Sequence, residues 1–414
     1  MKLLFTGPLL DFSGFAHASR GFAQMLTQIE DMDVVARPLR YDSLDAGQVF
    51  ETPEWLQSLL QKDLSGVEMA IQMTTCNIEA SPVPGVCNAL YTFLETDRIQ
   101  GTWVAKANEF DFLIVPCKAN ATAMMRSGVV KPIMVCAPPC DADVYEKDVP
   151  AFEIARSEGR TIFYNICQLS TKKGVDVLLR AYYAAFADMP DDVLLVLKTY
   201  LNMGNRQNDA AIVKQYIESV RAKCRIPVSK HPPVLPLVYT MSDDELAGLH
   251  KTGDAYVCSS RGEGWGIPVF DALGYGNTVI SHNAGGLEGF IRPDNALIYG
   301  GMPSLYFDMP HQDAGLFTGV EQCFEPSPAE LAAVMRRYHM LKVGAASDSL
   351  DEEGKLEWEH VTQRKGTAKE VVKNFDYRVV HSIIAPQLFA ANKSWHEDGG
   401  VKFNESVVEK IDVT

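Results

Sequence analysis

Short apolar runs alternate with amphipathic stretches along most of this chain. Apolar runs of strand length that are rich in branched and aromatic side chains are typical of strands buried on both faces of a parallel sheet. Strands separated by helical patterns indicate an α/β protein with doubly wound sheets. The expected strands are Lys2–Thr6, Val34–Leu39, Met69–Gln72, Asn88–Phe93, Phe112–Val115, Ile133–Cys136, Thr161–Cys167, Val193–Lys198, Val234–Tyr239, Ala255–Cys258 and Thr278–Ser281.

The amphipathic stretches predict helices, among them Ala18–Ile29, Val175–Ala187, Asp243–Lys251 and Tyr377–Leu388. Ser242 is a favourable N-cap for the third of these helices, and Glu245 completes a capping box with it. The segment Gly344–Lys365 is polar and charged, so it is expected to be a mobile loop.

The length of the chain predicts two domains, because 414 residues exceed what one hydrophobic core normally supports. The expected hinge comprises Ala137–Pro139 and the acidic run Asp141–Asp148, since prolines and charges disfavour regular ladders and burial. The first domain is therefore expected at 1–150 and the second at 151–376.

Composition narrows the class of protein. The nine cysteines contain no Cys-x-x-Cys pair, which predicts reduced thiols in a cytoplasmic protein and neither a disulfide framework nor a zinc site. No apolar run approaches the roughly 18 to 20 residues that a spanning helix needs, so no integral membrane segment is expected. The net charge of −15 disfavours nonspecific attraction to nucleic acid or to anionic lipid.

The segment Ser259–Gly286 carries the most informative chemistry in the chain. An apolar strand ends before it, its loop is rich in glycine, and Pro268 stands where the first turn of a helix tolerates a missing N–H. Unpaired backbone N–H groups at such a helix start are a natural seat for phosphate. Asp271 lies about one turn inside the helix, where its carboxylate can accept hydrogen bonds from ribose hydroxyls, and Glu263 stands on the loop. The alternative is an ordinary strand, loop and helix joined by a glycine-rich turn.

The string from Glu263 to Asp271, EGWGIPVFD, resembles the donor-site signature of the family-four retaining glycosyltransferases, which have the GT-B fold. The usual signature is Glu-Gly-Phe-Gly-Leu-Pro, with a second Glu eight positions after the first, where this chain has the shorter Asp271. The resemblance implies two Rossmann-like, doubly wound domains that face a central cleft. It also implies that a C-terminal helix, 377–395, completes the first domain and that the second domain, 151–376, binds the donor.

The resemblance extends to the string FYNICQLSTKKGVDVLL, in which a lysine-glycine pair precedes a helix. A lysine beside a helix start complements a diphosphate, although a solvated surface lysine is the alternative. In the family this pair binds the donor phosphate, and Gln168 occupies the place of a usual Arg or Lys, which Lys198 or Arg261 is expected to replace. The donor-binding residues implied are Gly14, Gln168, Lys173, Gly174, Lys198, Arg261, Gly264, Trp265, Gly266, Ile267 and Asp271.

Two strings in the first half are expected to contact the acceptor. GPLLDFSGFAHASR follows the first strand, so Ser13, Phe15 and His17 are expected at the carboxyl edge of the sheet. In the family this loop approaches both the donor phosphate and the acceptor. YTFLETDR resembles the Phe-Glu-Thr-Asp element of a bacterial and phage branch of the family, which assigns Glu95 and Asp97 to the acceptor side. Carboxylates at a strand end can orient or deprotonate a hydroxyl. The alternative reading is a helix-capping Thr-Asp pair beside a solvated glutamate.

These observations predict a glycosyltransferase that moves a sugar from a nucleoside diphosphate to an acceptor hydroxyl, and the resemblance implies that it retains the anomeric configuration. Glu263, Lys173, Glu95 and Asp97 are the expected catalytic residues. No metal is expected, because Asp141-Ala142-Asp143 follows no strand suited to a donor site, and no cofactor is expected to bind tightly. The co-substrate is expected to be a UDP- or GDP-sugar, and the enzyme would act in the cytoplasm of a bacterium or, if phage-encoded, of its host.

Three alternatives remain open. The first is a phage-type enzyme that glycosylates a hydroxymethylated DNA base, so that the acceptor is modified DNA instead of a glycan or small molecule. Its DNA-binding cations would be Lys106, Lys118, Arg126 and Lys131. The second is a nucleotide-sugar epimerase, and the third is a non-catalytic binder of sugar nucleotides in which Gln168 and Asp271 mark lost activity.

Overall fold

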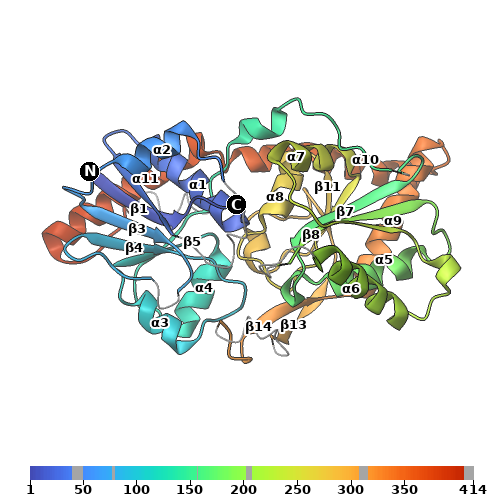
Figure 1. Cartoon of the computed structure of the whole chain (residues 1–414), viewed down its shortest axis with the longest axis horizontal. Coiled ribbons are helices and arrows are strands. Elements are labelled where there is room, and N and C mark those ends of the chain that lie inside the picture. The colour runs from blue at the N-terminus through green and yellow to red at the C-terminus, as the bar shows by residue number, and fades with distance from the viewer. Residues whose placement is uncertain (40–49, 77–79, 156, 202–207, 307–315, 405–414) are drawn as a thin grey trace. The chain divides into compact units, whose positions relative to one another are not determined.

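The computed structural model describes residues 1–39, 50–76, 80–155, 157–201, 208–306 and 316–404 (Figure 1). The chain divides into two compact units. The first unit comprises Met1–Ala142, Leu305–Gln322 and Lys373–Thr414, and the second comprises Asp143–Ser304 and Cys323–Val372. Each unit contains one parallel six-stranded sheet, as the alternation of apolar and amphipathic segments predicts.

The sheet of the first unit has the strand order β2-β1-β3-β4-β5-β6. Helices α1 and α11 lie on one face of it and α3 and α4 on the other (Figure 1). The strands are β1 (Lys2–Pro8), β2 (Asp33–Leu39), β3 (Met69–Met73), β4 (Cys87–Tyr91), β5 (Phe112–Val115) and β6 (Ile133–Val135). The helices are α1 (Gly14–Thr27), α2 (Glu54–Gln61), α3 (Gly101–Ala107), α4 (Lys118–Ser127) and α11 (Tyr377–Asp398).

The sheet of the second unit has the order β12-β11-β10-β7-β8-β9, with α5, α6 and α9 on one face and α7 and α8 on the other (Figure 1). Its strands are β7 (Thr161–Gln168), β8 (Val193–Tyr200), β9 (Val234–Leu237), β10 (Ala255–Val257), β11 (Thr278–Ser281) and β12 (Leu297–Ile298). The helices are α5 (Val175–Phe186), α6 (Asp209–Lys223), α7 (Asp243–Thr252), α8 (Ile267–Gly274), α9 (Pro328–Ala346) and α10 (Glu352–Lys373). A separate pair of strands consists of β13 (Gly301–Leu305) and β14 (Gln322–Pro326).

The first segment of the first unit ends at Ala142, whereas the first domain was expected to end at residue 150. Asp143–Pro150 belongs with the second unit, because Lys251 donates to the carbonyls of Lys147 and Val149 at 3.0 and 2.9 Å. Helix α11 groups with the first unit and extends to Asp398, beyond the expected end at 395, and Asp376 before it accepts a 2.8 Å hydrogen bond from the N–H of Ala142.

The expectation of a mobile loop at Gly344–Lys365 is wrong. Helix α9 continues to Ala346, and α10 begins at Glu352. Helix α10 buries Val361, Ala368 and Val372, which share one face at helical spacing. The polar composition of the segment reflects its exposed faces, and a narrow apolar stripe suffices to fix it on the core.

Local sequence signals explain several element ends. The capping box predicted at α7 is confirmed: the Glu245 N–H donates to Ser242 Oγ at 3.2 Å, and the Ser242 N–H donates to Glu245 Oε2 at 2.8 Å. The nine cysteines, all within the described ranges, form no disulfide. Among the helices that the structure describes, none has an apolar stretch long enough to cross a bilayer.

Candidate active site

Lys173 and Glu263 form an ion pair at the carboxyl edge of the second sheet. Lys173 lies in the 3₁₀ turn Thr171–Lys173 that follows β7, and Glu263 lies in the loop that follows β10, the neighbouring strand. The Lys173 ammonium donates to both carboxylate oxygens of Glu263 at 2.8 Å, and Ser260 Oγ donates to Oε1 at 2.5 Å. Side-chain exposure is 20% for Lys173 and 11% for Glu263, so the pair is largely shielded but reachable.

Gly174 allows the two turns to meet. It has a φ of 58°, and a Cβ at this position would lie 1.9 Å from the carbonyl oxygen of Ser259. The Ser259 hydroxyl donates to the carbonyl of Lys173 at 3.2 Å, and the Arg261 N–H donates to the carbonyl of Lys172 at 2.6 Å. The lysine-glycine pair of the sequence therefore serves the geometry of the turn as well as supplying a cation.

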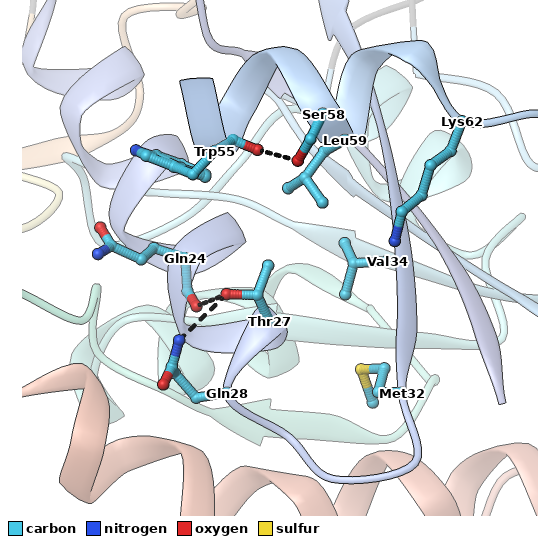
Figure 2. A pocket seen from close by; sticks show the side chains of 9 residues that line it. All are labelled: Gln24, Thr27, Gln28, Met32, Val34, Trp55, Ser58, Leu59 and Lys62. Atoms are coloured by element: carbon cyan, nitrogen blue, oxygen red, sulfur yellow. Dashed lines mark hydrogen bonds between the residues drawn. The ribbon is translucent and has the colours of Figure 1, made fainter. Parts of the chain in front are cut away.

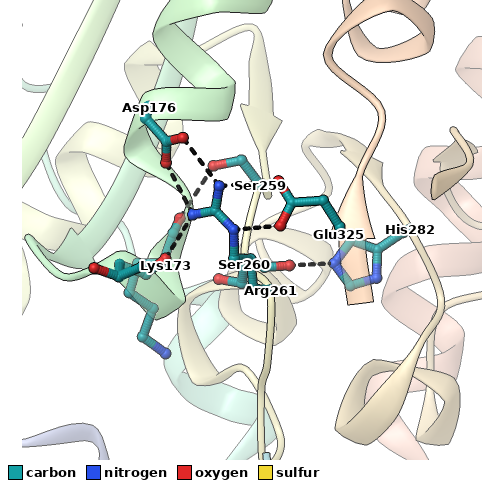
Figure 3. Close-up of polar contacts among 8 residues, drawn as sticks. Lys173, Asp176, Ser259, Ser260, Arg261, His282 and Glu325 are labelled. Carbon is teal, nitrogen blue, oxygen red and sulfur yellow. Dashed lines mark hydrogen bonds and ion pairs between the residues drawn. The ribbon is translucent and has the colours of Figure 1, made fainter. Parts of the chain in front are cut away.

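Arg261 is fully occupied by protein groups (Figure 3). It donates to both oxygens of Asp176 at 2.9 Å, to both oxygens of Glu325 at 2.6 and 3.0 Å, and to the carbonyl of Thr171 at 2.7 Å. Burial opposes its charge, but the hydrogen bonds to Asp176 and Glu325 outweigh burial and raise the pKa of the guanidinium. The expectation that Arg261 replaces the missing phosphate ligand does not fit this arrangement, because all five of its N–H donors are used.

A second glycine turn, which contains Gly286, packs against the Glu263 loop and forms a hydrogen bond with it. The N–H of Gly286 donates to the carbonyl of Glu263 at 2.9 Å, and a Cβ on Gly286 would lie 2.2 Å from the carbonyl oxygen of Gly264. His282 Nε2 lies 2.7 Å from the carbonyl of Ser260, while the N–H of Ala284 donates to His282 Nδ1. The hydrogen bonds thus assign the proton to Nε2, and burial lowers the pKa of His282 to about 4.

The start of α8 presents backbone more than side chains. Gly266 is its N-cap with a φ of 88°, Ile267 is its first residue, and Pro268 lies in its first turn. Trp265 is only 3% exposed and its ring packs against Phe290 at 4.8 Å between centroids. Its indole is therefore part of the core.

Asp271 lies in α8 and is half-buried. Its Oδ1 accepts a 2.8 Å hydrogen bond from the hydroxyl of Tyr145, which comes from the 3₁₀ turn Ala142–Glu146. The Tyr145 ring in turn meets Tyr275 edge to face at 5.1 Å. A ribose hydroxyl at Asp271 would share this carboxylate with Tyr145.

Gln168 and Lys198 come from adjacent strands. Gln168 is the last residue of β7, and Lys198 pairs in register with Ile166 near the end of β8. Lys198 is 7% exposed, and its ammonium lies 5.9 Å from the centre of the Tyr200 ring. Both residues lie toward the edge of the sheet that carries the Lys173 turn.

The N-terminal string forms the start of α1. Ser13 is the N-cap, and its hydroxyl accepts a 3.0 Å hydrogen bond from the N–H of Ala16. Gly14 and His17 are exposed, and the Phe15 ring meets Phe93 edge to face at 5.3 Å. Ser13 thus has a structural task at the place where it was expected to contact an acceptor.

The loop after β4 carries Glu95 and Asp97. Asp97 accepts hydrogen bonds from Arg98 and from the N–H of Gln322, and these outweigh partial burial and lower the pKa of the carboxyl. Asn120, which is 2% exposed, holds the loop through the N–H and carbonyl of Leu94 at 2.7 and 3.2 Å. Both candidate acids therefore stand on a fixed loop at a strand end.

Sequence reasoning missed the groups that hold the site together. Ser260 and Asp176 stand beside motif residues, and their proximity to Glu263 and Lys173 was the available signal. His282, Glu325 and Asn120 reach the site loops only through the fold, and no spacing pattern indicates them.

The first unit also contains a cavity of about 380 Å³ between α1, α2 and the beginning of β2 (Figure 2). Trp55, Gln24 and Lys62 are among its lining residues, and Lys62 is paired with Asp33 at 2.6 Å. The cavity lies at the amino end of β2, whereas the expected acceptor residues follow the carboxyl ends of β1 and β4. No expected site residue lines it.

No protein-family model matches the sequence, and no curated protein matches it. Several solved structures are similar to this chain. The N-terminal domain of Candida albicans trehalose-6-phosphate phosphatase aligns with a TM-score of 0.61 at 10% identity, covering 93% of this chain and 95% of that chain. Anabaena HepE in complex with UDP and glucose aligns with a TM-score of 0.59 at 14% identity, covering 94% and 99%.

A third structure is the UDP-forming α,α-trehalose-phosphate synthase from Burkholderia xenovorans in complex with glucose-6-phosphate. It aligns with a TM-score of 0.59 at 12% identity, covering 94% of this chain and 100% of that chain. These likenesses span nearly the whole chain at low identity, so they show the fold. Together with the two parallel six-stranded sheets, they identify this chain as a protein of the two-domain, Rossmann-like GT-B fold.

Proposed function

We propose that this chain is a retaining, metal-independent glycosyltransferase that moves a sugar from a nucleoside diphosphate to an acceptor hydroxyl. Lys173 and the N–H groups at the start of α8 stabilise the departing diphosphate, because preorganised donors complement charge that develops during bond cleavage. Glu263 binds a sugar hydroxyl and supports positive charge at the anomeric carbon. Asp271 binds the ribose, sharing its carboxylate with Tyr145.

One observation carries this proposal: Lys173 and Glu263, from turns after adjacent strands, meet at 2.8 Å beside the glycine-capped start of α8. Ligands of open α/β sheets bind at the carboxyl edge of the strands. A cation, an anion and a helix N-terminus placed there match the diphosphate and sugar of an activated donor. HepE, which shares the fold, was solved with UDP and glucose, so a UDP-sugar is the first donor to test.

On the acceptor side, Glu95 and Asp97 orient and activate the acceptor hydroxyl. Their loop is fixed by Asn120, which suits a group that must present a carboxylate at a defined place. Asp97, which accepts hydrogen bonds from Arg98 and from the N–H of Gln322, is held in place for this task. Phe15 and His17, at the start of α1, are the further residues proposed to contact the acceptor.

The first experiment is a thermal-shift screen with UDP-, GDP-, ADP- and dTDP-sugars, because a ligand that binds the native state raises the melting temperature. The sugar nucleotide that raises it most is then tested for transfer to glycans, small molecules and hydroxymethylated duplex DNA. Lys173→Ala and Glu263→Gln are each expected to lower transfer at least about a hundredfold with folding intact. The matched controls are Lys355→Ala and Glu352→Gln, which break an exposed pair on α10 at 3.3 Å.

Near-normal turnover in both site variants would contradict the assignment. Conversion of the donor sugar without an acceptor would identify an epimerase instead. Donor binding with neither hydrolysis nor transfer across the panel would identify a non-catalytic binder.

A further inference from the structure

Arg261 joins the two turns that carry the Lys173–Glu263 pair. On one side its guanidinium binds the carbonyl of Thr171 and both oxygens of Asp176, which frame the Lys173 turn. On the other side it binds both oxygens of Glu325 on β14. Its own backbone adds two more links, donating to Lys172 at 2.6 Å and accepting from Phe324 at 2.9 Å.

This arrangement fixes the backbone around Lys173, whose flexible side chain cannot hold its own ammonium in place. A lysine side chain has a flexible four-carbon stem and about 2 kcal/mol of rotamer entropy, so its ammonium stays in place only where the surrounding backbone is fixed. Bidentate contacts between arginine and carboxylate are charge-assisted and directional. Arg261 makes two of them within a side chain that is 11% exposed, so it defines the distance between the turns.

We propose that Arg261, anchored by Asp176 and Glu325, is the positioning residue for the Lys173–Glu263 pair and does not itself bind the donor diphosphate. The charges agree with this role, because the two carboxylates more than offset the charge of the guanidinium, and Lys173 is the cation that faces Glu263. The effect on sugar transfer rests on the proposed function, whereas the effect on the position of Lys173 does not.

The first test measures the reactivity of the Lys173 amine by reductive methylation and mass spectrometry. In the wild-type protein Lys173 should react more slowly than Lys214, an exposed lysine on α6. Arg261→Gln should raise the Lys173 rate at least about fivefold, and Arg261→Lys should raise it nearly as much, because an ammonium cannot reproduce the guanidinium fork.

The matched control is Arg336→Gln on α9, which breaks a bidentate ion pair with Asp188 at 2.7 Å. This variant should leave the methylation rate of Lys173 unchanged. If Arg261→Gln fails to fold, Glu325→Gln removes one anchor and should give a smaller rise in the same direction. An unchanged Lys173 rate in a folded Arg261→Gln or Glu325→Gln protein would overturn the proposal.

The second test separates positioning from direct binding of the diphosphate. A misplaced Lys173 should lower kcat about tenfold or more, and in a Lys173→Ala background Arg261→Gln should change the inhibition constant of the nucleoside diphosphate less than about threefold. A direct ligand would instead weaken nucleoside diphosphate binding about tenfold further in that background and be rescued by Arg261→Lys, which would refute the proposal. If the wild-type protein transfers no sugar, the proposed function fails, and the methylation rates still decide the role of Arg261.

Discussion

The substitution Glu263→Gln is expected to separate nucleotide binding from sugar transfer. In the free protein the Lys173 ammonium donates two 2.8 Å hydrogen bonds to Glu263, so a diphosphate must compete with this carboxylate for the lysine. Glutamine keeps the shape of the side chain and removes the charge. Binding of the nucleoside diphosphate should therefore become tighter, while transfer falls because no anion faces the anomeric carbon.

The magnitude follows from the ion pair. Two unit charges about 4 Å apart interact with about 4 kcal/mol at an effective dielectric constant of about 20. Side-chain exposures of 20% and 11% allow water to screen the pair, and glutamine keeps one hydrogen bond to Lys173. A net gain of about 1.4 kcal/mol is a reasonable share of that interaction, which corresponds to a tenfold lower Kd.

Isothermal titration calorimetry with the nucleoside diphosphate of the preferred donor measures this directly. Glu263→Gln should lower Kd about tenfold, Lys173→Ala should raise it, and the exposed-pair variant Glu352→Gln should match the wild type. If Glu263→Gln weakens nucleotide binding as Lys173→Ala does, the carboxylate does not compete for Lys173 and the reasoning is refuted.

Three further predictions concern stability. Gly174→Ala should lower the free energy of unfolding by at least about 3 kcal/mol in urea titrations, because its Cβ would lie 1.9 Å from a carbonyl oxygen. The control Gly159→Ala, at a φ of 72° with open space around it, should lower it by only about 1 kcal/mol. Equal losses in the two variants would contradict this prediction. Burial lowers the pKa of His282 to about 4, so the unfolded chain takes up a proton near the ordinary value of 6.5, before the folded chain does. The free energy of unfolding should therefore fall as pH drops from 6.5 toward 4, by up to about 1.4 kcal/mol per pH unit. His282→Gln should flatten that slope, and an unchanged slope would contradict this assignment to His282. Asn120→Ala should cost about 2 to 3 kcal/mol in urea titrations because it leaves two buried backbone groups of Leu94 without partners, and a loss below about 0.5 kcal/mol would show that water replaces them.

Periodicity and capping chemistry predict most of the fold. The strand β5 and the strand β11 have the bounds expected from apolar runs, and the capping box marks the start of α7. Prediction failed where a helix buries only a narrow stripe: Val361, Ala368 and Val372 fix α10, but they are diluted by charged residues in the sequence. Local composition cannot reveal such a stripe without knowledge of the surface that it covers.

The candidate site likewise contains residues that the sequence indicates and residues that only the fold brings to it. The turns that carry Lys173 and Glu263 follow apolar strands and contain glycines, so both are visible in the sequence. The partners of Arg261 are not, because Glu325 reaches it from a strand far along the chain. The sequence therefore suggests Arg261 as a ligand of the donor phosphate, although its N–H donors are already bound to protein groups in the fold.

The most direct measurement is a crystal structure of the complex with the nucleotide sugar that gives the largest thermal shift. We predict that the Lys173 ammonium lies within hydrogen-bond distance of a diphosphate oxygen, that Glu263 contacts a sugar hydroxyl, and that Arg261 keeps its contacts with Asp176 and Glu325. A diphosphate bound away from the Lys173 turn and the start of α8, with the Lys173–Glu263 pair unchanged, would contradict it.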